Sequence, residues 1–223
     1  MFEIEIKSLL GGQEKALELK RRLVQLFPAM KVLPSHKQRN HYFNTPATLD
    51  AVYTSVTPLI GEEKRDDLKK STEQGSKVSI RTREADGKTL FIIKASIGDD
   101  TSANGISRIE FEEPVSLTLD ELDKRLLDAG LTYQAKWSRE RDEFDLGAVH
   151  VTVDKNAGYG YLAEFEKMIS DGAQAEQATH ELKALMAQLH CVELEQDRLE
   201  RMFAHYNKHW GEYYGTDKTF TIE

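Results

Sequence analysis

The sequence predicts an α+β fold in a single domain, with a largely antiparallel sheet closed into a β-barrel, charged residues inside and helices packed outside. Short segments with strand character follow one another along the chain, mostly with short connections. These segments alternate ionised and apolar residues with a period of two. Amphipathic helical segments supply apolar faces that would cover the sheet. The 223 residues are enough for one sizeable domain with its own core.

The expected elements follow from these periodicities and from the residues that interrupt them. Asp86-Gly87 marks a tight turn between two strands, and Gly130 ends a helix that starts near Thr118. The polar segment 60–77 is expected to be a loop that contains a helical piece. The expected strands are residues 1–7, 41–46, 77–84, 88–96, 107–115, 139–147, 148–156 and 161–169. The expected helices are residues 14–27, 118–131, 175–190 and 192–210.

The first strand, MFEIEIK, places two carboxylates and a lysine on one face and isoleucines on the other. The same division recurs in later strands, each with ionised residues on one face and apolar residues opposite. Lys94 is less regular, because it interrupts an otherwise apolar strand. The polar and ionised residues on these faces are Glu3, Glu5, Lys7, Arg81, Arg83, Arg108, Glu110, Glu112, Arg139, Arg141, Thr152, Asp154, Glu164 and Glu166.

Two interpretations of these faces are open. The first is the solvated side of an ordinary antiparallel sheet, which shows the same alternation. The second is the interior of a closed barrel. Arginine dominates where lysine would serve a solvated face equally well, and acidic pairs occur at both ends of the chain. The helices also need an apolar surface to cover. These three features favour the barrel interior.

An interior with charges of both signs would be costly if it were dry and unpaired. It becomes favourable if it is hydrated and binds a ligand that also carries both signs. A magnesium–triphosphate complex is such a ligand, because its phosphate oxygens bind arginine and lysine while its cation binds carboxylates. On this interpretation, Glu3 and Glu5 repel one another until a cation, Mg²⁺ or Mn²⁺, lies between them.

Several of these motifs, taken in order, resemble those of the CYTH, or triphosphate tunnel metalloenzyme, superfamily. EIEIK at the N-terminus resembles the family's Glu-x-Glu-x-Lys motif, and Lys94 falls where the family has a strand lysine. The other matching motifs are YFNTP, IRTR, SRIEFE, RERDEF, VTVD and GYGYLAEFE. The resemblance covers roughly residues 1–170 and implies one CYTH-like domain over residues 1–223. The helices expected within residues 173–210 would pack on the barrel or close it.

The resemblance also implies the roles of individual residues. Metal binding is implied for Glu3, Glu5, Glu164 and Glu166, with Glu110, Glu112 and Asp154 nearby. Phosphate binding is implied for Lys7, Arg81, Arg83, Lys94, Arg108, Arg139 and Arg141. A catalytic role is implied for Glu3, Glu5, Lys7 and Arg139.

The sequence departs from the family pattern at two positions. Asn44 stands where the family has an aspartate, and Arg139 stands where lysine is common. The second change keeps the charge and alters the geometry, and Lys136 is a candidate to compensate for it. The segment 47–77 is longer than the family pattern, so substrate contacts there are not transferred.

The family includes class IV adenylyl cyclases, thiamine triphosphatases and inorganic or RNA triphosphatases. The resemblance therefore implies a metal-dependent enzyme acting on a triphosphate. Hydrolysis is the preferred activity, because it needs only the charged cluster, whereas cyclisation of ATP also needs a nucleoside pocket. A polyanion-binding module without turnover is a third possibility, and the paired acids count against it.

Composition and single residues narrow the class of protein further. The net charge of −8 argues against a nucleic-acid binder, and no apolar run is long enough to span a bilayer. The acidic start is unlike a secretory leader, and the lone Cys191 fits a reducing cytoplasm and a packing role. The sequence leaves a monomer and a homodimer equally open.

A few histidines and aromatic residues have spacings that suggest other roles. His205 and His209 have the i, i+4 spacing of a zinc pair but lack a third ligand, so a zinc site is not predicted. His150 shares the face of Asp154 and is a candidate for a supporting role. Tyr159 and Tyr161 flank the closing Gly-rich turn and are candidates for nucleoside contact, whereas both tryptophans are expected to pack in the core.

Overall fold

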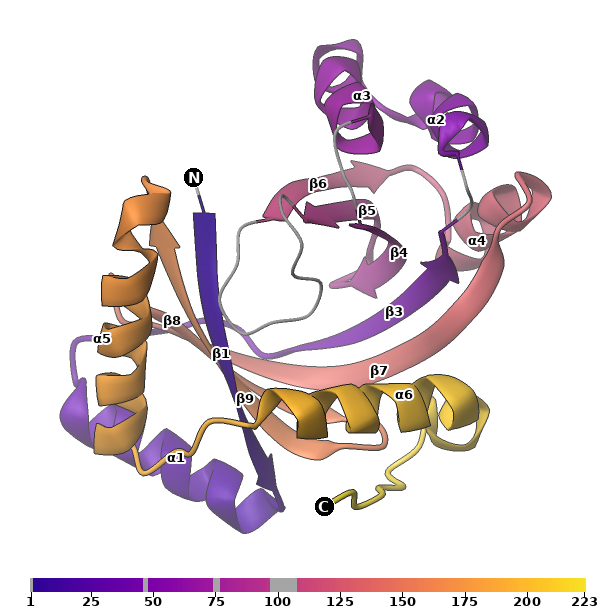
Figure 1. Cartoon of the computed structure of the whole chain (residues 1–223). Helices are drawn as coiled ribbons and strands as arrows, with labels where there is room; N and C mark the ends of the chain where they lie inside the picture. Colours follow the sequence, from indigo (N-terminus) through magenta and orange to yellow (C-terminus); the bar gives the residue numbers. More distant parts are fainter. Residues whose placement is uncertain (1, 46–47, 74–76, 97–107) are drawn as a thin grey trace. The chain divides into compact units, whose positions relative to one another are not determined.

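The computed structural model describes residues 2–45, 48–73, 77–96 and 108–223. These residues pack into two compact units. The first unit contains residues 2–37 and 138–223, and the second contains the described residues between 38 and 137. Each unit has its own sheet segment and helices (Figure 1), and each has its own core.

The sheet of the first unit is antiparallel, in the order β1, β9, β8 and the C-terminal part of β7. Its strands are β1 (Phe2–Gly11), β7 (Thr132–Asp145), β8 (His150–Asn156) and β9 (Gly160–Ile169), and the short β2 (Lys31–Val32) pairs with β7. Its helices are α1 (Gln13–Leu26), α5 (Ala175–Gln188) and α6 (Gln196–Tyr213), with the 3-10 turn η3 (Gly172–Gln174) before α5.

The second unit is built around an antiparallel sheet in the order β3, β4, β5 and β6. These strands are β3 (His36–Asn44), β4 (Lys77–Ala85), β5 (Lys88–Ser96) and β6 (Arg108–Val115). Its helices are α2 (Asp50–Val56), α3 (Arg65–Glu73) and α4 (Leu119–Asp128), with 3-10 turns η1 (Thr57–Leu59) and η2 (Glu62–Lys64).

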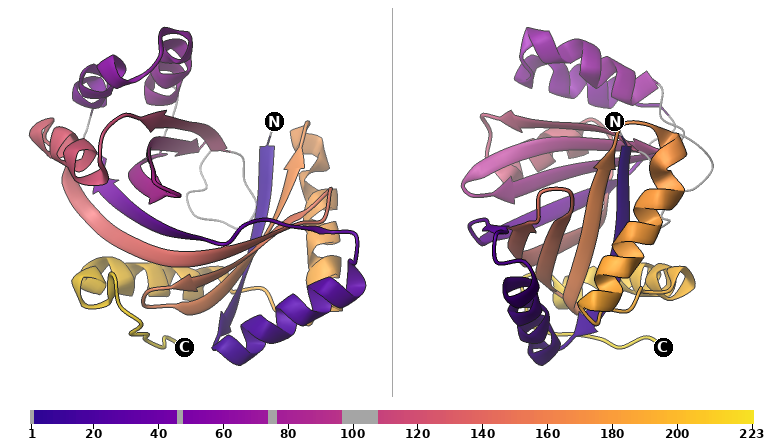
Figure 2. Two further views of the ribbon diagram at one scale, coloured as in Figure 1. Left: turned by 180° about the vertical axis from the view of Figure 1, so that it is seen from behind. Right: turned by 90° about the vertical axis from the view of Figure 1, so that its left-hand side faces the viewer.

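The core of the first unit lies between its sheet and the helices α1 and α5. Ile4 and Ile6 of β1 are each 1% exposed, and they pack with Leu23 of α1 and Leu182 of α5. Both helices contact the β1–β9 pair, and α5 runs alongside it (Figure 2). The amphipathic helices therefore cover the apolar face of the sheet, as their stripes require.

The core of the second unit lies between its sheet and α2, α3 and α4. Ile80, Phe91 and Ile93 from the sheet pack with Leu68 of α3 and Leu122 of α4. Each of these side chains is buried. Burial of such large apolar side chains contributes roughly 1.5–3 kcal/mol each, so these contacts fix the helices on the sheet.

The predicted start and stop residues act locally as expected. Thr118 caps α4, accepting a bond from the Glu121 N–H, and the Glu121 carboxylate accepts one from the Thr118 N–H. Gly130 has φ +93° just after the helix, where a side chain would be strained. Asp86 and Gly87 both have positive φ in the β4–β5 turn.

The predicted α+β fold with an antiparallel sheet is confirmed. Closure of the sheet is not found, because among the described residues no ladder joins β1 to β6. The sequence argument for closure used the alternation of faces, and alternation does not determine how the first and last strands pair. Helix α2 and the N-terminal half of β7 were missed, and α3 occupies part of the expected loop.

No helix in the described part of the chain is both long enough and apolar enough to cross a membrane.

Candidate active site

The strand register of the first unit brings its ionised side chains together on one face. Glu5 lies opposite Glu166, which lies opposite His150 on the next strand. Lys7 lies opposite Glu164 one row further along. Residues directly opposite one another in an antiparallel pair share a face. We call this surface the ionic face; it comprises Glu3, Glu5, Lys7, Arg139, Arg141, Glu143, His150, Thr152, Asp154, Glu164 and Glu166.

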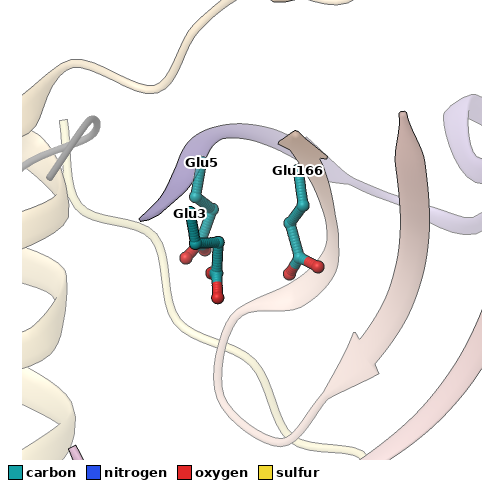
Figure 3. Close-up of side chains that lie close together, drawn as sticks. All are labelled: Glu3, Glu5 and Glu166. Atoms are coloured by element: carbon teal, nitrogen blue, oxygen red, sulfur yellow. The ribbon is translucent and has the colours of Figure 1, made fainter. Parts of the chain in front are cut away.

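Three carboxylates form a cluster at one end of the ionic face. Glu3 and Glu5 come from β1 and Glu166 from β9, and one oxygen of each lies within 4.8 Å of the others (Figure 3). We call this group the carboxylate cluster. Within the described part of the chain, it is the one set of three acidic, histidine or cysteine side chains close enough to share a cation.

The donor set of the carboxylate cluster fits a hard divalent cation. All of its donors are carboxylate oxygens, which Mg²⁺ and Mn²⁺ prefer over soft ligands. The three negative charges repel one another, and a positive group reduces that repulsion. The ammonium of Lys7 already contacts the Glu5 carboxylate and lies 3.5 Å from Glu164 Oε1. The cluster therefore suits positive charge, and of the predicted metal ligands it contains Glu3, Glu5 and Glu166.

A second group, next to the carboxylate cluster, holds two arginines on a buried aspartate. Asp154 is fully buried, and Arg139 Nη1 donates to it at 2.9 Å. Arg141 donates to Asp154 through Nε at 2.7 Å and Nη2 at 2.6 Å, and Nη2 also donates to Glu164 at 2.5 Å. Asp154 and Glu164, both predicted as metal ligands, thus contact arginines in this structure.

These ion pairs stabilise the charged forms of Arg141 and Glu164. Burial alone would lower the pKa of Arg141, but the carboxylates of Glu164 and Asp154 raise it above its ordinary value. Burial would raise the pKa of Glu164, but the charges of Lys7, Arg141 and Arg139 hold it well below its usual range. The face therefore presents permanent positive charge next to the carboxylate cluster.

His150 connects the carboxylate cluster to Glu143, a residue that sequence reasoning missed. Its Nδ1 lies 3.4 Å from Glu166 Oε2, and its Nε2 lies 3.1 Å from Glu143 Oε2. The contact with Glu166, opposed by burial and supported by the charge of Glu143, raises the pKa of His150. The i, i+2 spacing of Glu143 from Arg141 was the signal that could have placed it on the ionic face.

In the second unit, the two arginines of β4 lie on the same face. The Arg81 guanidinium lies over the Tyr42 ring, 4.5 Å from its centroid. Arg83 donates to the Asn40 side chain at 2.7 Å and to Glu112 Oε1 at 3.2 Å. Glu112, a predicted metal ligand, therefore pairs with an arginine of its own unit.

Of the remaining predicted residues of the second unit, Lys94 is placed by the strand register. Lys94 lies opposite Ser79, on the face that carries Arg81 and Arg83. The structure describes the backbone of Arg108 and Glu110 and not their side chains.

One sequence-based suggestion is corrected, and another stays a prediction. Tyr159 is 7% exposed and packs edge-on against Tyr206 and Phe220, so its ring is unavailable to a nucleoside. Lys136 lies over the Tyr133 ring, 4.1 Å from its centroid, and 4.0 Å from Asp123 Oδ2 in the second unit. The suggestion that Lys136 compensates for the change at Arg139 stays a prediction.

Four other residues bear on the predicted chemistry. His205 and His209 stack with ring centroids 4.7 Å apart, and the described residues supply no third ligand for zinc. Burial raises the pKa of the Cys191 thiol to about 11, which suits the expected packing role and not that of a nucleophile. Asn44 donates to Thr132 Oγ1 at 2.9 Å.

A buried network on α4 was missed by sequence reasoning. Asp123 Oδ2 lies 2.6 Å from His41 Nδ1 and accepts from the Tyr133 hydroxyl at 2.7 Å. Its Oδ1 accepts from the Thr82 hydroxyl at 2.5 Å. Burial would raise the pKa of Asp123, but these contacts, led by His41, lower it. The position of Asp123 among the buried leucines of α4 was the signal that could have revealed it.

Comparison with known proteins relates the chain to one family. The family described as "CYTH domain" matches residues 1–198, which spans both compact units. The comparison with curated proteins gave no significant match.

Among solved structures, a conserved hypothetical protein from Pyrococcus furiosus is similar, with a TM-score of 0.60 and 18% identity. The alignment covers 87% of this chain and 93% of that one. A protein from Vibrio parahaemolyticus, described as a "putative adenylate cyclase", has a TM-score of 0.60 and 18% identity, over 92% of this chain and 98% of that one. At these identities the likeness shows the fold.

Proposed function

This chain belongs to the CYTH domain family, and on that premise we propose that it is a divalent-metal-dependent enzyme that hydrolyses a triphosphate. Family membership supports a triphosphate as the ligand class. The enclosed tunnel that the sequence predicts, and the choice among inorganic, thiamine and nucleoside triphosphates, remain predictions. The substrate is a small molecule in each case.

The observation that carries this proposal is the arrangement of charge on the ionic face. Three carboxylates converge at one end, and Lys7 links Glu5 of this cluster to Glu164. Arg141 contacts Glu164 and Asp154, and Arg139 contacts Asp154. A metal–triphosphate complex has the complementary pattern, with a cation flanked by phosphate oxygens. A purely anion-binding surface would have no use for the carboxylate cluster.

The roles of the residues follow from their contacts. Glu3, Glu5 and Glu166 would hold Mg²⁺ or Mn²⁺, which supplies Lewis-acid polarisation of phosphoryl oxygens and activates water. Lys7 and the two arginines would neutralise the charge of the phosphates. Asp154 and Glu164 would hold the arginine forks in one orientation. For Arg81, Arg83 and Lys94 of the second unit, phosphate binding remains a prediction from the sequence.

Cyclisation of ATP with release of pyrophosphate is the second candidate. It is favoured by the description of the Vibrio parahaemolyticus structure, which shares this fold. In that reaction a ribose hydroxyl, in place of water, attacks the first phosphorus. The ionic face can serve either nucleophile, so the products decide between the two activities.

The test is to incubate the protein with Mg²⁺ or Mn²⁺ and tripolyphosphate, thiamine triphosphate or ATP, and to resolve the products. We expect orthophosphate. Cyclic AMP with pyrophosphate would establish the cyclase instead, and tight binding without product would establish a binding module.

The variant Glu5→Gln removes one charge of the carboxylate cluster without changing its size. We expect metal-dependent turnover to fall by at least about 100-fold, as for the loss of a group that stabilises the transition state. Glu14→Gln, an exposed glutamate of α1, is the matched control and should retain wild-type turnover. Wild-type rates in Glu5→Gln would refute the metal assignment.

A further inference from the structure

His150 lies between two carboxylates that belong to different parts of the ionic face. It starts β8 and lies opposite Glu166 in the antiparallel ladder. Its Nδ1 faces Glu166 Oε2 at 3.4 Å, and its Nε2 faces Glu143 Oε2 at 3.1 Å. Each ring nitrogen therefore has one carboxylate partner, and the ring is held from two sides.

Glu143, the partner of His150 Nε2, is itself held in place by a second histidine. His36, at the start of β3, places its Nε2 3.2 Å from Glu143 Oε1. The two oxygens of Glu143 thus each face one histidine. The side chains of His36 and Glu143 are 12% and 17% exposed, so their freedom to rotate is restricted. A continuous line of contacts runs from His36 through Glu143 and His150 to Glu166.

We propose that His150 is a positioning residue that holds the Glu166 carboxylate in the carboxylate cluster, and that Glu143 and His36 hold His150. This inference rests on the proposed function, in which Glu166 binds the divalent cation. Glu166 needs such a partner because its flexible side chain faces the negative charges of Glu3 and Glu5. A donor fixed on one carboxylate oxygen opposes that repulsion and reduces the rotamer freedom lost when a cation binds.

The expected consequence is tighter metal binding and not a new catalytic step. Partners that orient metal-ligating side chains typically change metal affinity by about 10- to 100-fold. His150 is not a member of the carboxylate cluster, so its removal leaves the three ligands in place. Its loss should therefore weaken binding of the cation.

The direct test measures Mn²⁺ binding to the intact protein without substrate, from the loss of the free Mn²⁺ signal in electron paramagnetic resonance. We expect His150→Ala to raise the Mn²⁺ dissociation constant by about 10-fold. His150→Asn, whose amide nitrogen occupies a position close to Nδ1, should restore most of the affinity. His150→Gln reaches the position of Nε2 and should not restore it. His180→Ala, an exposed histidine of α5, is the matched control.

His36 and Glu143, which hold His150 in this proposal, give an independent check. His36→Ala and Glu143→Gln should each weaken Mn²⁺ binding by about threefold, less than the loss of His150 itself. Combined with His150→Ala they should add nothing further, because they act through the same ring. The circular dichroism spectrum and urea midpoint of each variant check that it folds.

The possible outcomes separate the two proposals. If wild type binds Mn²⁺ and His150→Ala binds it equally well, the positioning role is overturned and the proposed function stands. Equal loss of Mn²⁺ affinity in the Asn and Ala variants also overturns positioning, because a donor at the Nδ1 position would then not support Glu166. If wild-type protein binds no Mn²⁺, the metal-dependent function fails and this inference fails with it.

Discussion

Each unit holds a buried aspartate, and the partners of the two differ in kind. Asp154 in the first unit is held by the guanidinium groups of Arg139 and Arg141. Asp123 in the second unit is held by an imidazole and two hydroxyl groups. Both carboxylates are almost inaccessible to solvent. Burial alone therefore does not distinguish a carboxylate that serves ligand binding from one that serves the fold.

The partners make that distinction. Guanidinium groups keep their charge at every physiological pH and present further donors, so Asp154 orients positive charge that can meet a phosphate. The donors on Asp123 come from β3, β4 and β7 and converge on α4, in the unit's interior. That network attaches a helix to three strands. We expect substitutions near Asp154 to affect turnover and substitutions at Asp123 to affect stability.

The largest expected effect is that of Arg141→Ala. It removes a phosphate ligand of the proposed site and leaves the Asp154 and Glu164 carboxylates with less compensation. Triphosphate kcat/KM should fall by about 1,000-fold, as for the loss of a preorganised donor. Steady-state assays at saturating Mn²⁺ measure this loss.

Arg21→Ala is the control, because Arg21 lies exposed on α1, where it pairs with Glu18 at the surface. Arg141→Lys keeps the charge and loses the forked geometry, so its kcat/KM should lie between those of Arg141→Ala and Arg21→Ala. This variant also serves as a check if Arg141→Ala fails to fold. A change of less than threefold in a folded Arg141→Ala protein would contradict the role of this group.

The second effect concerns stability. Asp123→Ala removes the acceptor for His41, Thr82 and Tyr133, and leaves buried donors unsatisfied. The free energy of unfolding should fall by about 3 kcal/mol, measured by urea denaturation. Asp128→Ala on the same helix, where the pair with Lys124 is exposed, should cost less than about 0.5 kcal/mol. A loss below about 1 kcal/mol for Asp123→Ala would mean that the network does not hold α4.

The difference between the two aspartates also explains what the sequence could predict. Asp154 was found because a strand displays its faces with a period of two, so VTVD places it beside known charges. Asp123 was missed among the several acids of its helix, TLDELDKRLLD, although its spacing from Leu119 and Leu126 places it on their face. Its partners lie far away in sequence, and local patterns carry no information on such pairings.

The same limit applies to the fold and the site. Face alternation predicted the ionic face, and the register then brought Glu3 and Glu5 close to Glu166. Alternation could not decide whether the sheet closes, because closure depends on pairing between distant segments. Nor could it predict that Glu164 pairs with Arg141, because that choice depends on side-chain rotamers.

The third effect is the counterpart of the second on the ionic face. Asp154→Asn keeps the size and one acceptor oxygen but removes the charge that orients both arginines. We expect kcat/KM to fall by about 30-fold, equivalent to about 2 kcal/mol. Asp123→Asn should leave kcat/KM unchanged in the same assay. If Asp123→Asn lowered turnover as much as Asp154→Asn, the division of roles between the two aspartates would be wrong.

The smallest effect is the pH dependence of the Asp123 network. The pKa of Asp123 is lowered in the folded protein, so the folded state binds fewer protons than the unfolded chain in the acidic range. The stabilisation is therefore complete above the unfolded-state pKa of about 4 and is lost as the pH falls through the folded-state value. The difference in urea midpoint between wild type and Asp123→Asn should shrink below about pH 4, because asparagine does not titrate.

Thr82→Val sharpens this test by removing one donor to Asp123. With weaker support for the ionised form, the pKa of Asp123 moves back towards its ordinary value, and less stability depends on pH. The acid-sensitive part of the midpoint should therefore be smaller in Thr82→Val than in wild type. A wild-type-to-Asp123→Asn difference that stays constant from neutral to strongly acidic pH would show that Asp123 gains nothing from ionisation. In that case the network would hold α4 as a set of neutral hydrogen bonds, and only the first unit would depend on buried charge.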